Sequence, residues 1–365
     1  MVITIKRFYE AGDSYTIVGR LRSSHSKIMK IKFLLALVIF FTASGIFAQT
    51  KPEISKVDRI RLAEAFRIGE ILGNKVWKDW DNAPFAVLLV TPENEFLIRH
   101  PQPSKDFTLV GYDSLLKSNV YFRKRTKEIN LLATYPAVGG ISTIVIGQAE
   151  NTSRKTSTPW VVTMLHEHFH QLQSSQATYY KEVDALNLSG GDQTGMWQLN
   201  FAFPYKDAQV NERFSRLSKL LAETLQTRKK SDFSANLKQY LQARQEFQQM
   251  LSEADYRYFS FQIWQEGIAR YTELRIAGLA ARKYKPSKKF LALKDYTPFK
   301  EVADSTLNNQ ILANLPTLQL EKWERNVFYP FGAAEGLLLD RTNRKWQSRY
   351  FTEKFYIDKF FINTN

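Results

Sequence analysis

Cysteine is absent from this chain of 365 residues. Its absence excludes disulfide bonds, thiol catalysis, metal sites built from thiolates and a lipid anchor attached to cysteine. Histidine is scarce as well, since the whole sequence contains only five. Three of these five lie within residues 166–170, so this short segment holds most of the imidazole groups of the chain.

Acidic residues are outnumbered by basic ones. The chain has 36 Asp and Glu against 51 Lys and Arg, a formal net charge of +15 at pH 7. Without residues 1–48, which carry seven Lys or Arg and two Asp or Glu, the charge is +10. This balance favours acidic partners, such as anionic polymers, envelope surfaces or acidic peptides. No basic run with interleaved aromatic residues occurs, so we expect no nucleic-acid partner.

Long hydrophobic runs are also missing, apart from one at residues 33–41. Lys30 and Lys32 precede this run, and small residues lead from it to Ala48. This order is typical of a secretory signal peptide, which predicts translation from Met29, cleavage after Ala48 and export to the periplasm or the medium. The run is too short for a comfortable membrane span, so we expect no stable span after cleavage. An uncleaved N-terminal anchor is the alternative.

The segment at 166–170 reads His-Glu-His-Phe-His and therefore contains the pattern HExxH. Histidines four residues apart lie on one side of an α-helix, where both rings can bind one tetrahedral zinc ion. Glu167 would then reach a water on the metal and act as general base. Upstream, Ser157 and Thr158 followed by Pro159 predict the start of this helix, with a hydroxyl cap and a proline in the first turn.

On a helical wheel the segment has two different faces. The polar face comprises Thr163, His166, Glu167, His170, Gln173 and Ser174, and the apolar face comprises Val161, Met164, Leu165, Phe169 and Leu172. His168 falls in the middle of the apolar face, so it cannot share a metal with its neighbours. We expect His168 to lie in the core and to bond a backbone carbonyl.

A catalytic zinc site usually has three protein ligands and a water. Because cysteine is absent and His100 lies far upstream in a hairpin, the third ligand should be a carboxylate. Glu182 and Asp184 are near in sequence but have no distinctive setting. Glu266 lies in a strongly helical stretch and precedes Gly267-Ile-Ala, small residues that would let its helix pack tightly against the HExxH helix. The sequence therefore predicts Glu266 as the third ligand.

With these residues the chain resembles the gluzincin branch of zinc metallopeptidases, in which HExxH is completed by a glutamate on a later helix. The uncharged flanks of the motif are similar to the longer pattern of that family, and residues 266–269 resemble its third-ligand helix. The resemblance implies a zincin-like fold and one zinc ion held by His166, His170 and Glu266. It also implies hydrolysis of peptide bonds with Glu167 as general base.

The resemblance further implies a second donor that polarises the substrate carbonyl, commonly a tyrosine or a histidine. Tyr329, in a Phe-Tyr-Pro-Phe-Gly turn before a small-residue helix start, is the predicted donor, and Tyr271 is the alternative. Glu273 lies two turns beyond Glu266, with Arg270 between them. Glu273 or Arg270 could brace a zinc-binding histidine, or the two could form an exposed ion pair along the helix.

The elements expected from periodicity are a helix at residues 53–73, strands within 84–147 and mainly helices from Pro159 onward. The predicted class is α+β, with an N-terminal mixed sheet followed by a mainly helical catalytic and C-terminal region. In the resembled family an edge strand of the sheet aligns the substrate, and residues 141–146 occupy the corresponding place. The expected regions are 1–48 (upstream segment and signal peptide), 49–158 (sheet), 159–285 (helical zinc site) and 286–365 (helical C-terminal region).

Three classes of function are compatible with these observations. The leading one is an exported zinc peptidase acting on peptides or proteins. The second is a zinc-dependent hydrolase of a non-peptide amide, and the third is a non-catalytic binding protein that zinc stabilises. Glu167 favours the two catalytic classes, because a structural zinc site needs no general base. The sequence leaves the substrate, the choice of exo- or endopeptidase and the oligomeric state open.

Overall fold

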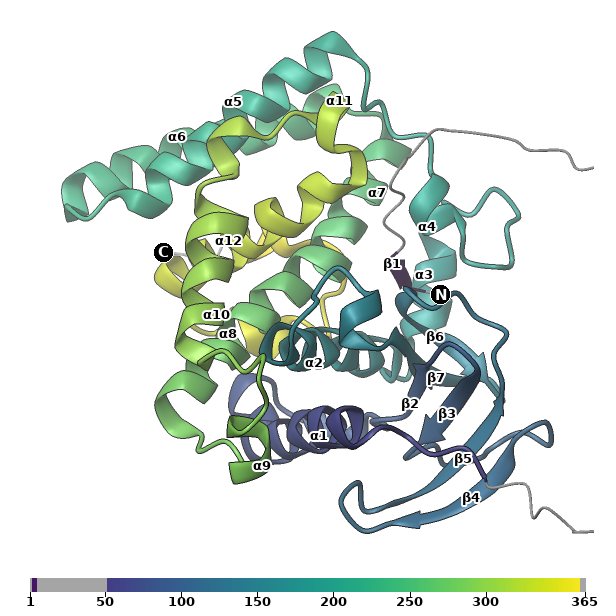
Figure 1. The fold of residues 1–365 in the computed structure, drawn as a ribbon. Coiled ribbons are helices and arrows are strands. Elements are labelled where there is room, and N and C mark those ends of the chain that lie inside the picture. The colour runs from purple at the N-terminus through teal and green to yellow at the C-terminus, as the bar shows by residue number, and fades with distance from the viewer. Residues whose placement is uncertain (1, 5–50, 362–365) are drawn as a thin grey trace, which may run out of the picture. The chain divides into compact units, whose positions relative to one another are not determined.

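A mixed β-sheet and a larger set of helices make up the residues described by the computed structural model, 2–4 and 51–361 (Figure 1). The expected α+β class is confirmed at this level, because the sheet precedes most of the helices in the chain. Residues 52–361 and the strand at 2–4 belong to one unit. The proposed signal peptide and its cleavage position lie outside the described residues. Within the described ranges, no helix is both long enough and apolar enough to cross a bilayer.

The sheet has seven strands in the order β1-β6-β7-β2-β3-β5-β4. β2 and β7 pair in parallel, and all other neighbouring strands pair antiparallel. Leu88 of β2 and Val145 of β7 are fully buried, as expected for central strands covered on both faces. The strands are β1 (Val2–Thr4), β2 (Val87–Val90), β3 (Asn94–Ile98), β4 (Thr108–Asp113), β5 (Ser118–Lys124), β6 (Leu132–Val138) and β7 (Ile141–Gly147).

The prediction that residues 141–146 form an edge strand is wrong. β7 lies inside the sheet, between β6 and β2, and β6 pairs on its other side with β1. A short apolar run identifies a buried strand, but the order of strands depends on partners that are distant in sequence. Thr134 of β6 is the sheet residue that donates a hydrogen bond to the motif glutamate, Glu167.

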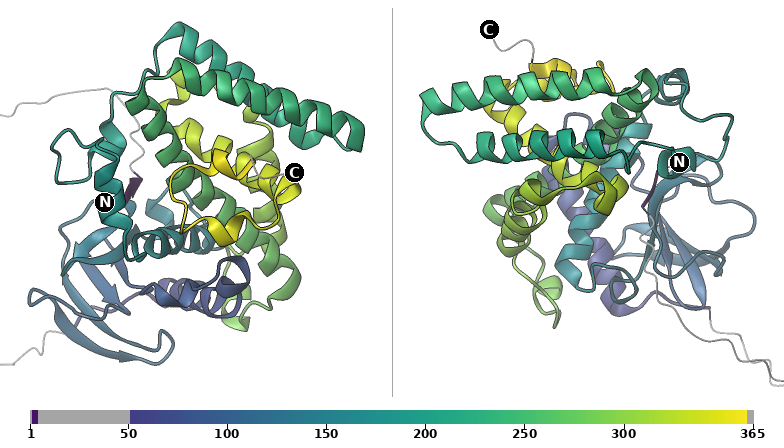
Figure 2. Two further views of the ribbon diagram at one scale, coloured as in Figure 1. Left: turned by 180° about the vertical axis from the view of Figure 1, so that it is seen from behind. Right: turned by 90° about the horizontal axis from the view of Figure 1, so that it is seen from above.

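Three helices pack against one another beside the sheet: α1 (Lys56–Val76), α2 (Ser157–Ser174) and α8 (Ile268–Lys283) (Figure 1). α5 (Ala208–Gln226) and α6 (Lys230–Met250) form a long helical hairpin, which both views of Figure 2 show side by side. The other α-helices are α3 (Tyr179–Ala185), α4 (Trp197–Asn200), α7 (Glu253–Gln262), α9 (Lys288–Leu291), α10 (Phe299–Ser305), α11 (Leu320–Trp323), α12 (Phe328–Thr342) and α13 (Trp346–Arg349). The expected helix at 53–73 corresponds to α1.

Helix α2, which carries the motif, is buried over nearly its whole length. Of its 18 residues, Pro159 and Ser174 alone are not buried. The polar side expected from the helical wheel is therefore covered by protein, and its charged and imidazole groups must find partners there. His166 and His170 on that side lie within ion-pair distance of carboxylates from the region around α8.

A carboxylate from far along the chain holds the start of α2. Ser157 begins the helix and Pro159 lies in its first turn, as predicted. The hydroxyl cap is wrong: Thr156 makes no cap hydrogen bond, and Ser157 instead donates its N–H and Oγ–H to Asp295 at 2.9 and 2.6 Å. Arg61 of α1 binds both Ser157 and Asp295, at 2.9 and 3.0 Å. A carboxylate suits this position because the helix dipole favours negative charge at a helix N-terminus.

Two glycines allow a close crossing between the π-helical turn Ile263–Gly267 and helix α12. A Cβ added to Gly332 would lie 2.6 Å from the Cα of Gly267, and a Cβ on Gly267 would lie 2.5 Å from the Cα of Gly332. The predicted packing of this helix against the HExxH helix is confirmed for α8, which contacts α2, but Gly267 itself contacts α12 and not α2. The crossing brings Glu266, the neighbour of Gly267, close to the first turn of α12.

Gly332→Ala should lower the free energy of unfolding by about 1–3 kcal/mol or more, because the added methyl group has no space in the helix crossing. Gly278→Ala is the matched control within α8, since its added Cβ would meet only the end of Arg282, at 3.5 Å. Helix propensity predicts that this control is stabilised by up to about 1 kcal/mol. Urea unfolding followed by circular dichroism measures both variants. Equal effects would contradict a tight crossing.

Asp295→Asn should destabilise the protein in a pH-dependent way. Burial opposes the shift, but hydrogen bonds from Ser157 and the charge of Arg61 hold the pKa of Asp295 below its usual range. Such a carboxylate stabilises the fold above its unfolded pKa of about 3.9, and this contribution is lost as the pH falls through the lower folded value. We expect a loss of about 1 kcal/mol at pH 7 that shrinks below about pH 4. Urea unfolding at pH 7 and pH 3 checks this, and a constant difference would contradict it.

Candidate metal centre

The two motif histidines meet on one side of α2, as their spacing predicts. Their Nε2 atoms lie 3.2 Å apart, and the exposed fractions of the side chains are 4% for His166 and 0% for His170. Two ring nitrogens this close repel through their lone pairs unless a proton or a cation lies between them. The pair is therefore arranged to hold positive charge.

Glu266 completes a cluster of three possible ligands. Its Oε2 lies 3.5 Å from Nε2 of His170 and 3.9 Å from Nε2 of His166. Metal bonds of about 2.0–2.1 Å in a tetrahedral arrangement place ligand atoms roughly 3.3 Å apart, close to the three separations here. Oε2 has no hydrogen-bond partner among residues 51–361, as expected of an oxygen that serves a cation. The three side chains could thus hold one metal ion.

The carboxylates that follow the motif more closely in sequence do not join this cluster. Glu182 of α3 forms an ion pair with Lys354, at 2.7 Å. Asp184, on the same short helix, is exposed. Among the described residues, the group that can hold a metal contains Glu266 and neither of these two.

Glu266 approaches the histidines from the π-helical turn Ile263–Gly267, which separates α7 from α8. A π turn adds one residue to a helical turn and changes the direction of the side chains beside it, and such turns are frequent at functional sites. Here the turn lets Glu266 face α2 while Gly267 keeps its contact with α12. Sequence periodicity predicted a continuous helix at this place and did not detect the turn.

Arg325, which sequence reasoning missed, holds the second oxygen of Glu266. It donates from Nη2 to Oε1 of Glu266 and from Nη1 to the hydroxyl of Tyr329, the latter at 3.1 Å. Burial would raise the pKa of Glu266, but the charges of Arg325 and His170 hold it well below its usual range. Glu324, the residue before Arg325, has a φ of 45°, a conformation that costs a non-glycine residue about 1–3 kcal/mol. The chain tolerates this strain next to a residue that the site requires.

The second ring nitrogen of each histidine in the cluster faces a polar side chain. Nδ1 of His170 lies 2.6 Å from Oε1 of Gln173, which assigns the proton to Nδ1 and directs the Nε2 lone pair to the cluster. Nδ1 of His166 lies 3.3 Å from Oε2 of Glu273, within ion-pair distance but without a hydrogen bond among the described residues. Glu273 also binds Arg270, but Glu273 is buried and the Arg270 side chain is only 13% exposed, so the interpretation as an exposed surface pair is wrong. Metal-binding histidines are typically braced in this way.

Glu167 is held by one oxygen only. Its Oε2 accepts a hydrogen bond from Oγ1 of Thr134, at 2.8 Å. Its Oε1 is buried and has no hydrogen-bond partner within the described part of the chain. A carboxylate with one fixed and one available oxygen is well arranged to accept a proton at a defined position. Sequence reasoning missed Thr134, because nothing in its strand distinguishes it from other threonines.

Of the two tyrosine candidates, Tyr329 lies beside the cluster and Tyr271 does not. The ring of Tyr329 is nearly parallel to that of His166, at a centroid distance of 6.3 Å. Tyr271 donates its hydroxyl to Asp340 at 2.9 Å, and its ring packs edge-on against Trp346. The hydroxyl and the ring of Tyr271 are thus both engaged in contacts away from the cluster.

His168 lies in the core, as expected, although its predicted bonding partner is wrong. Its Nδ1 lies 2.7 Å from Oε1 of Gln171, a side-chain amide, where a backbone carbonyl was expected. The ring stacks on Phe85 at a centroid distance of 3.9 Å. Burial lowers the pKa of His168 to about 4, so the ring is neutral at physiological pH.

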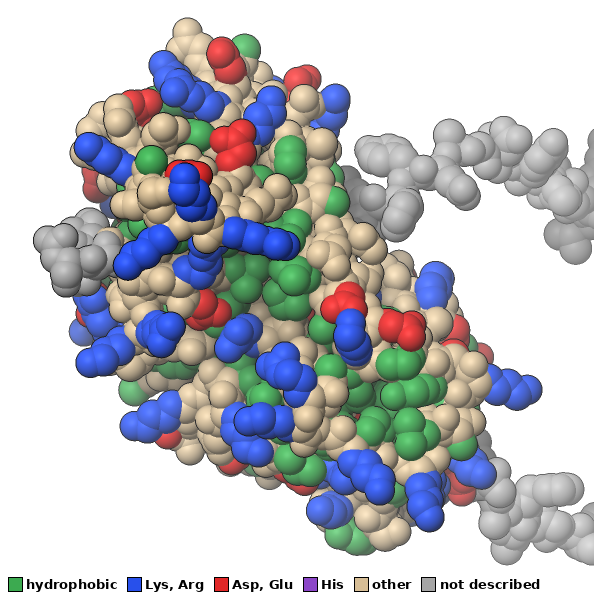
Figure 3. All heavy atoms as spheres, turned by 90° about the vertical axis from the view of Figure 1, so that its left-hand side faces the viewer, with side chains coloured by type: hydrophobic (Ala, Val, Ile, Leu, Met, Phe, Trp, Pro, Cys, Tyr) green, Lys and Arg blue, Asp and Glu red, His purple; other side chains and the backbone are tan. Residues whose placement is uncertain are grey.

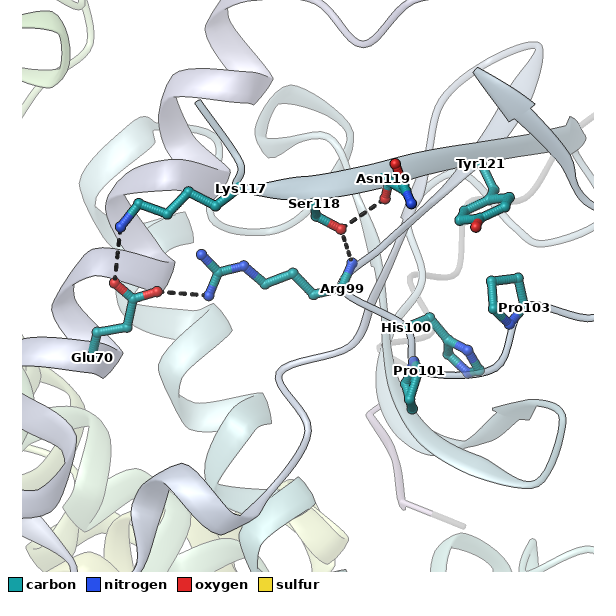
Figure 4. Close-up of a pocket in the computed structure, with 9 residues that line it drawn as sticks. All are labelled: Glu70, Arg99, His100, Pro101, Pro103, Lys117, Ser118, Asn119 and Tyr121. Carbon is teal, nitrogen blue, oxygen red and sulfur yellow. Dashed lines mark hydrogen bonds and ion pairs between the residues drawn. The ribbon is translucent and has the colours of Figure 1, made fainter. Parts of the chain in front are cut away.

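His100 belongs to a different part of the surface. It lines a cavity of about 650 Å³ in which Arg99 and Lys117 both reach Glu70 of α1 (Figure 4). A second cavity of about 470 Å³ shares these three charged residues. Neither cavity is lined by a residue of the His166, His170 and Glu266 cluster, so cavity size does not mark the candidate site.

Glu273→Gln should weaken the binding of zinc by about 10–100-fold, because an amide braces the His166 ring less strongly than a carboxylate. Competition with a chromophoric chelator measures the affinity. Glu353→Gln is the control, since it removes the same charge from a partly exposed pair with Arg349. Unchanged zinc affinity in Glu273→Gln would refute the bracing role.

Comparison of this chain with protein families, curated proteins and solved structures found no relative. No family model, no curated protein and no solved structure matches this chain. The resemblance to gluzincins therefore stays a prediction, and the geometry of the cluster is the observation that bears on it.

Proposed function

We propose that this chain is a zinc-dependent metallopeptidase of the gluzincin type, with a zincin-like arrangement of its motif helix and third-ligand helix. One observation carries the proposal. Nε2 of His166, Nε2 of His170 and Oε2 of Glu266 form a buried group with separations of 3.2, 3.5 and 3.9 Å. Two imidazoles and one carboxylate, without thiolates, are a ligand set typical of catalytic zinc, and a tetrahedral ion would keep one position open.

A zinc ion at this place would lower the pKa of a water towards about 7 and polarise a substrate carbonyl. Glu167 would take the proton of that water on its available oxygen and later return it to the leaving amine. Thr134 supports this step, because its hydrogen bond fixes the other oxygen of Glu167. The position of the carboxylate is then set by the sheet as well as by α2.

Tyr329 and Arg325 would serve the carbonyl oxygen of the substrate. A hydroxyl that accepts a hydrogen bond from a guanidinium becomes a stronger donor, and Arg325 makes such a bond to Tyr329. The same guanidinium holds Glu266. A developing negative charge on the substrate would thus meet a donor that is already oriented, which is the arrangement that stabilises tetrahedral intermediates.

An open, catalytic site explains the environment of Glu167 better than a structural site does. Structural zinc is usually enclosed by four protein ligands, whereas three form the group in the described residues. The buried Oε1 of Glu167 has no partner there, and an unsatisfied buried acceptor costs about 1–3 kcal/mol. A binding protein that used zinc only for stability would gain nothing from this arrangement.

Zinc content and peptide hydrolysis of the full chain test the proposal. We expect the wild type to bind zinc tightly and Glu266→Ala to lose it. Glu182→Ala is the control at the nearest alternative ligand and should keep zinc. Glu167→Gln should also keep zinc, but its kcat on a mixed peptide library should fall by about 10²–10⁴-fold.

Three results would contradict parts of this proposal. Full zinc retention in Glu266→Ala would remove Glu266 from the ligand set. Undiminished hydrolysis by Glu167→Gln would remove the general base. A zinc-loaded wild type that cleaves no peptide, but hydrolyses non-peptide amides, would replace the peptidase by the second class of zinc hydrolase.

A further inference from the structure

Three arginines form ion pairs with the buried carboxylates of the site, Glu266 and Glu273. Arg154, Arg270 and Arg325 pair with its carboxylates and have exposed side-chain fractions of 18%, 13% and 14%. The three ligands and Glu273 are at most 4% exposed. Guanidinium groups are thus the most accessible charged groups of the site.

The charge balance of the site is positive once a divalent cation is present. The three arginines are matched by three glutamates, which are Glu167, Glu266 and Glu273. A divalent ion would add two positive charges without a further anion from the described residues. Figure 3 shows Lys and Arg side chains predominating over Asp and Glu on one face of the protein, in keeping with the net charge of +15. Both the local and the long-range field therefore favour an anionic ligand.

Arg154 is the arginine whose partners are incomplete. Arg325 binds Glu266 and Tyr329, and Arg270 binds Glu273 and Gln310 at hydrogen-bond distance. The guanidinium of Arg154 makes no hydrogen bond to the residues described. Its nearest carboxylate is that of Glu273, at 3.7 Å, which Arg270 already binds.

The incomplete pairing of Arg154 is costly for a side chain in this position. Its Nε is buried without a hydrogen-bond partner among the described residues. Burial lowers the pKa of Arg154, Glu273 opposes this shift and Arg270 adds to it, but a guanidinium still remains protonated at neutral pH. The fold thus keeps a partly desolvated cation with unused donors.

Arg154 approaches Glu273 from the segment that leads into α2. It lies in the turn before α2, where its N–H donates to Thr152 and its carbonyl accepts from the N–H of Thr156 at 2.6 Å. Lys155, the next residue, has a left-handed φ of 55°, as Glu324 has beside Arg325. Nη2 of Arg154 lies 3.7 Å from Oε2 of Glu273, and that oxygen lies 3.3 Å from Nδ1 of His166, so Arg154 borders the candidate site on the side of Glu273.

We propose that Arg154 binds a carboxylate of the substrate, so that the enzyme prefers peptides with a carboxylate close to the scissile bond. This inference rests on the proposed peptidase function and specifies its substrate class. A guanidinium fork matches the two oxygens of a carboxylate and forms charge-assisted hydrogen bonds with it. The carboxylate comes either from a free peptide C-terminus or from an Asp or Glu side chain.

Matched peptide pairs test the inference. The substrates are fluorogenic heptapeptides with Glu or Gln scanned through every position, each with a free or an amidated C-terminus. For the wild type we expect kcat/KM to be about ten-fold or more higher for a carboxylate peptide than for its amide twin. A preference for the free terminus identifies a C-terminal carboxylate, and a preference for Glu at one position identifies an acidic side chain.

Arg154→Gln should bring this ratio close to one, and Arg154→Lys should restore part of it. Arg213→Gln removes the same charge from α5, where Arg213 is half exposed and pairs with Glu246, and should leave the ratio unchanged. A ratio that Arg154→Gln does not change would overturn the inference. Arg154 would then be only an ion-pair partner of Glu273.

Equilibrium binding separates the two proposals. Zinc-loaded Glu167→Gln protein is titrated calorimetrically with the same peptides, with and without the Arg154→Gln change. Tighter binding of carboxylate peptides that depends on Arg154 supports the inference even if the wild type cleaves no peptide, in which case only the peptidase function fails. Binding that ignores the carboxylate overturns the inference even if the wild type is an active peptidase.

Discussion

The ionised carboxylate of Glu266, buried between two imidazoles and a guanidinium, is the constraint on which the rest of the site depends. An isolated charge in a protein interior costs several kcal/mol, so it must be balanced on both of its oxygens. Arg325 balances Oε1, while Oε2 faces the Nε2 atoms of His166 and His170. Burial would lower the pKa of His170, but Glu266 raises it, so a proton on this ring can supply positive charge on the second side. A metal ion bound by the three side chains would supply it in place of that proton.

The close packing of two backbone segments places Glu266 and Arg325 next to each other. Gly267 and Gly332 lack side chains where the π-helical turn meets α12, so the two backbones approach as closely as van der Waals contact allows. Glu266 directly precedes Gly267. Tyr329 lies in the first turn of α12, three residues before Gly332, and Arg325 lies in the short turn that leads into this helix. A wider crossing would move the guanidinium away from the carboxylate and the hydroxyl away from the His166 ring. One packing contact thus positions the proposed ligand Glu266, its counter-charge and the proposed donor together.

Features of the site that depend on residues close together in the sequence could be predicted, whereas features that depend on contacts between distant residues could not. The placement of the HExxH side chains follows from helix pitch alone, so the sequence was sufficient. Glu266 was identified correctly as a member of the cluster, but for a partly wrong reason, because Gly267 contacts α12 and not α2. Arg325 and Thr134 are ordinary residue types with no local pattern, and only tertiary packing brings them to the site. The prediction of an edge strand failed for the same reason, since the apolar run at 141–146 would look the same at the edge of the sheet or in its interior.

The arginines around the cluster would have opposing effects on the proposed metal and on the proposed substrate. Three cations near a divalent ion would weaken its binding by repulsion, and each of them lies within ion-pair distance of a glutamate that offsets its charge. Arg154 is the least compensated, since it shares Glu273 with Arg270 and His166. Folding already removes much of the water around the guanidinium of Arg154. A carboxylate that binds there would therefore form an ion pair without the full desolvation cost of the arginine. The missing negative charge would then be supplied by the ligand, and the charge balance of the site would be complete only when substrate is bound.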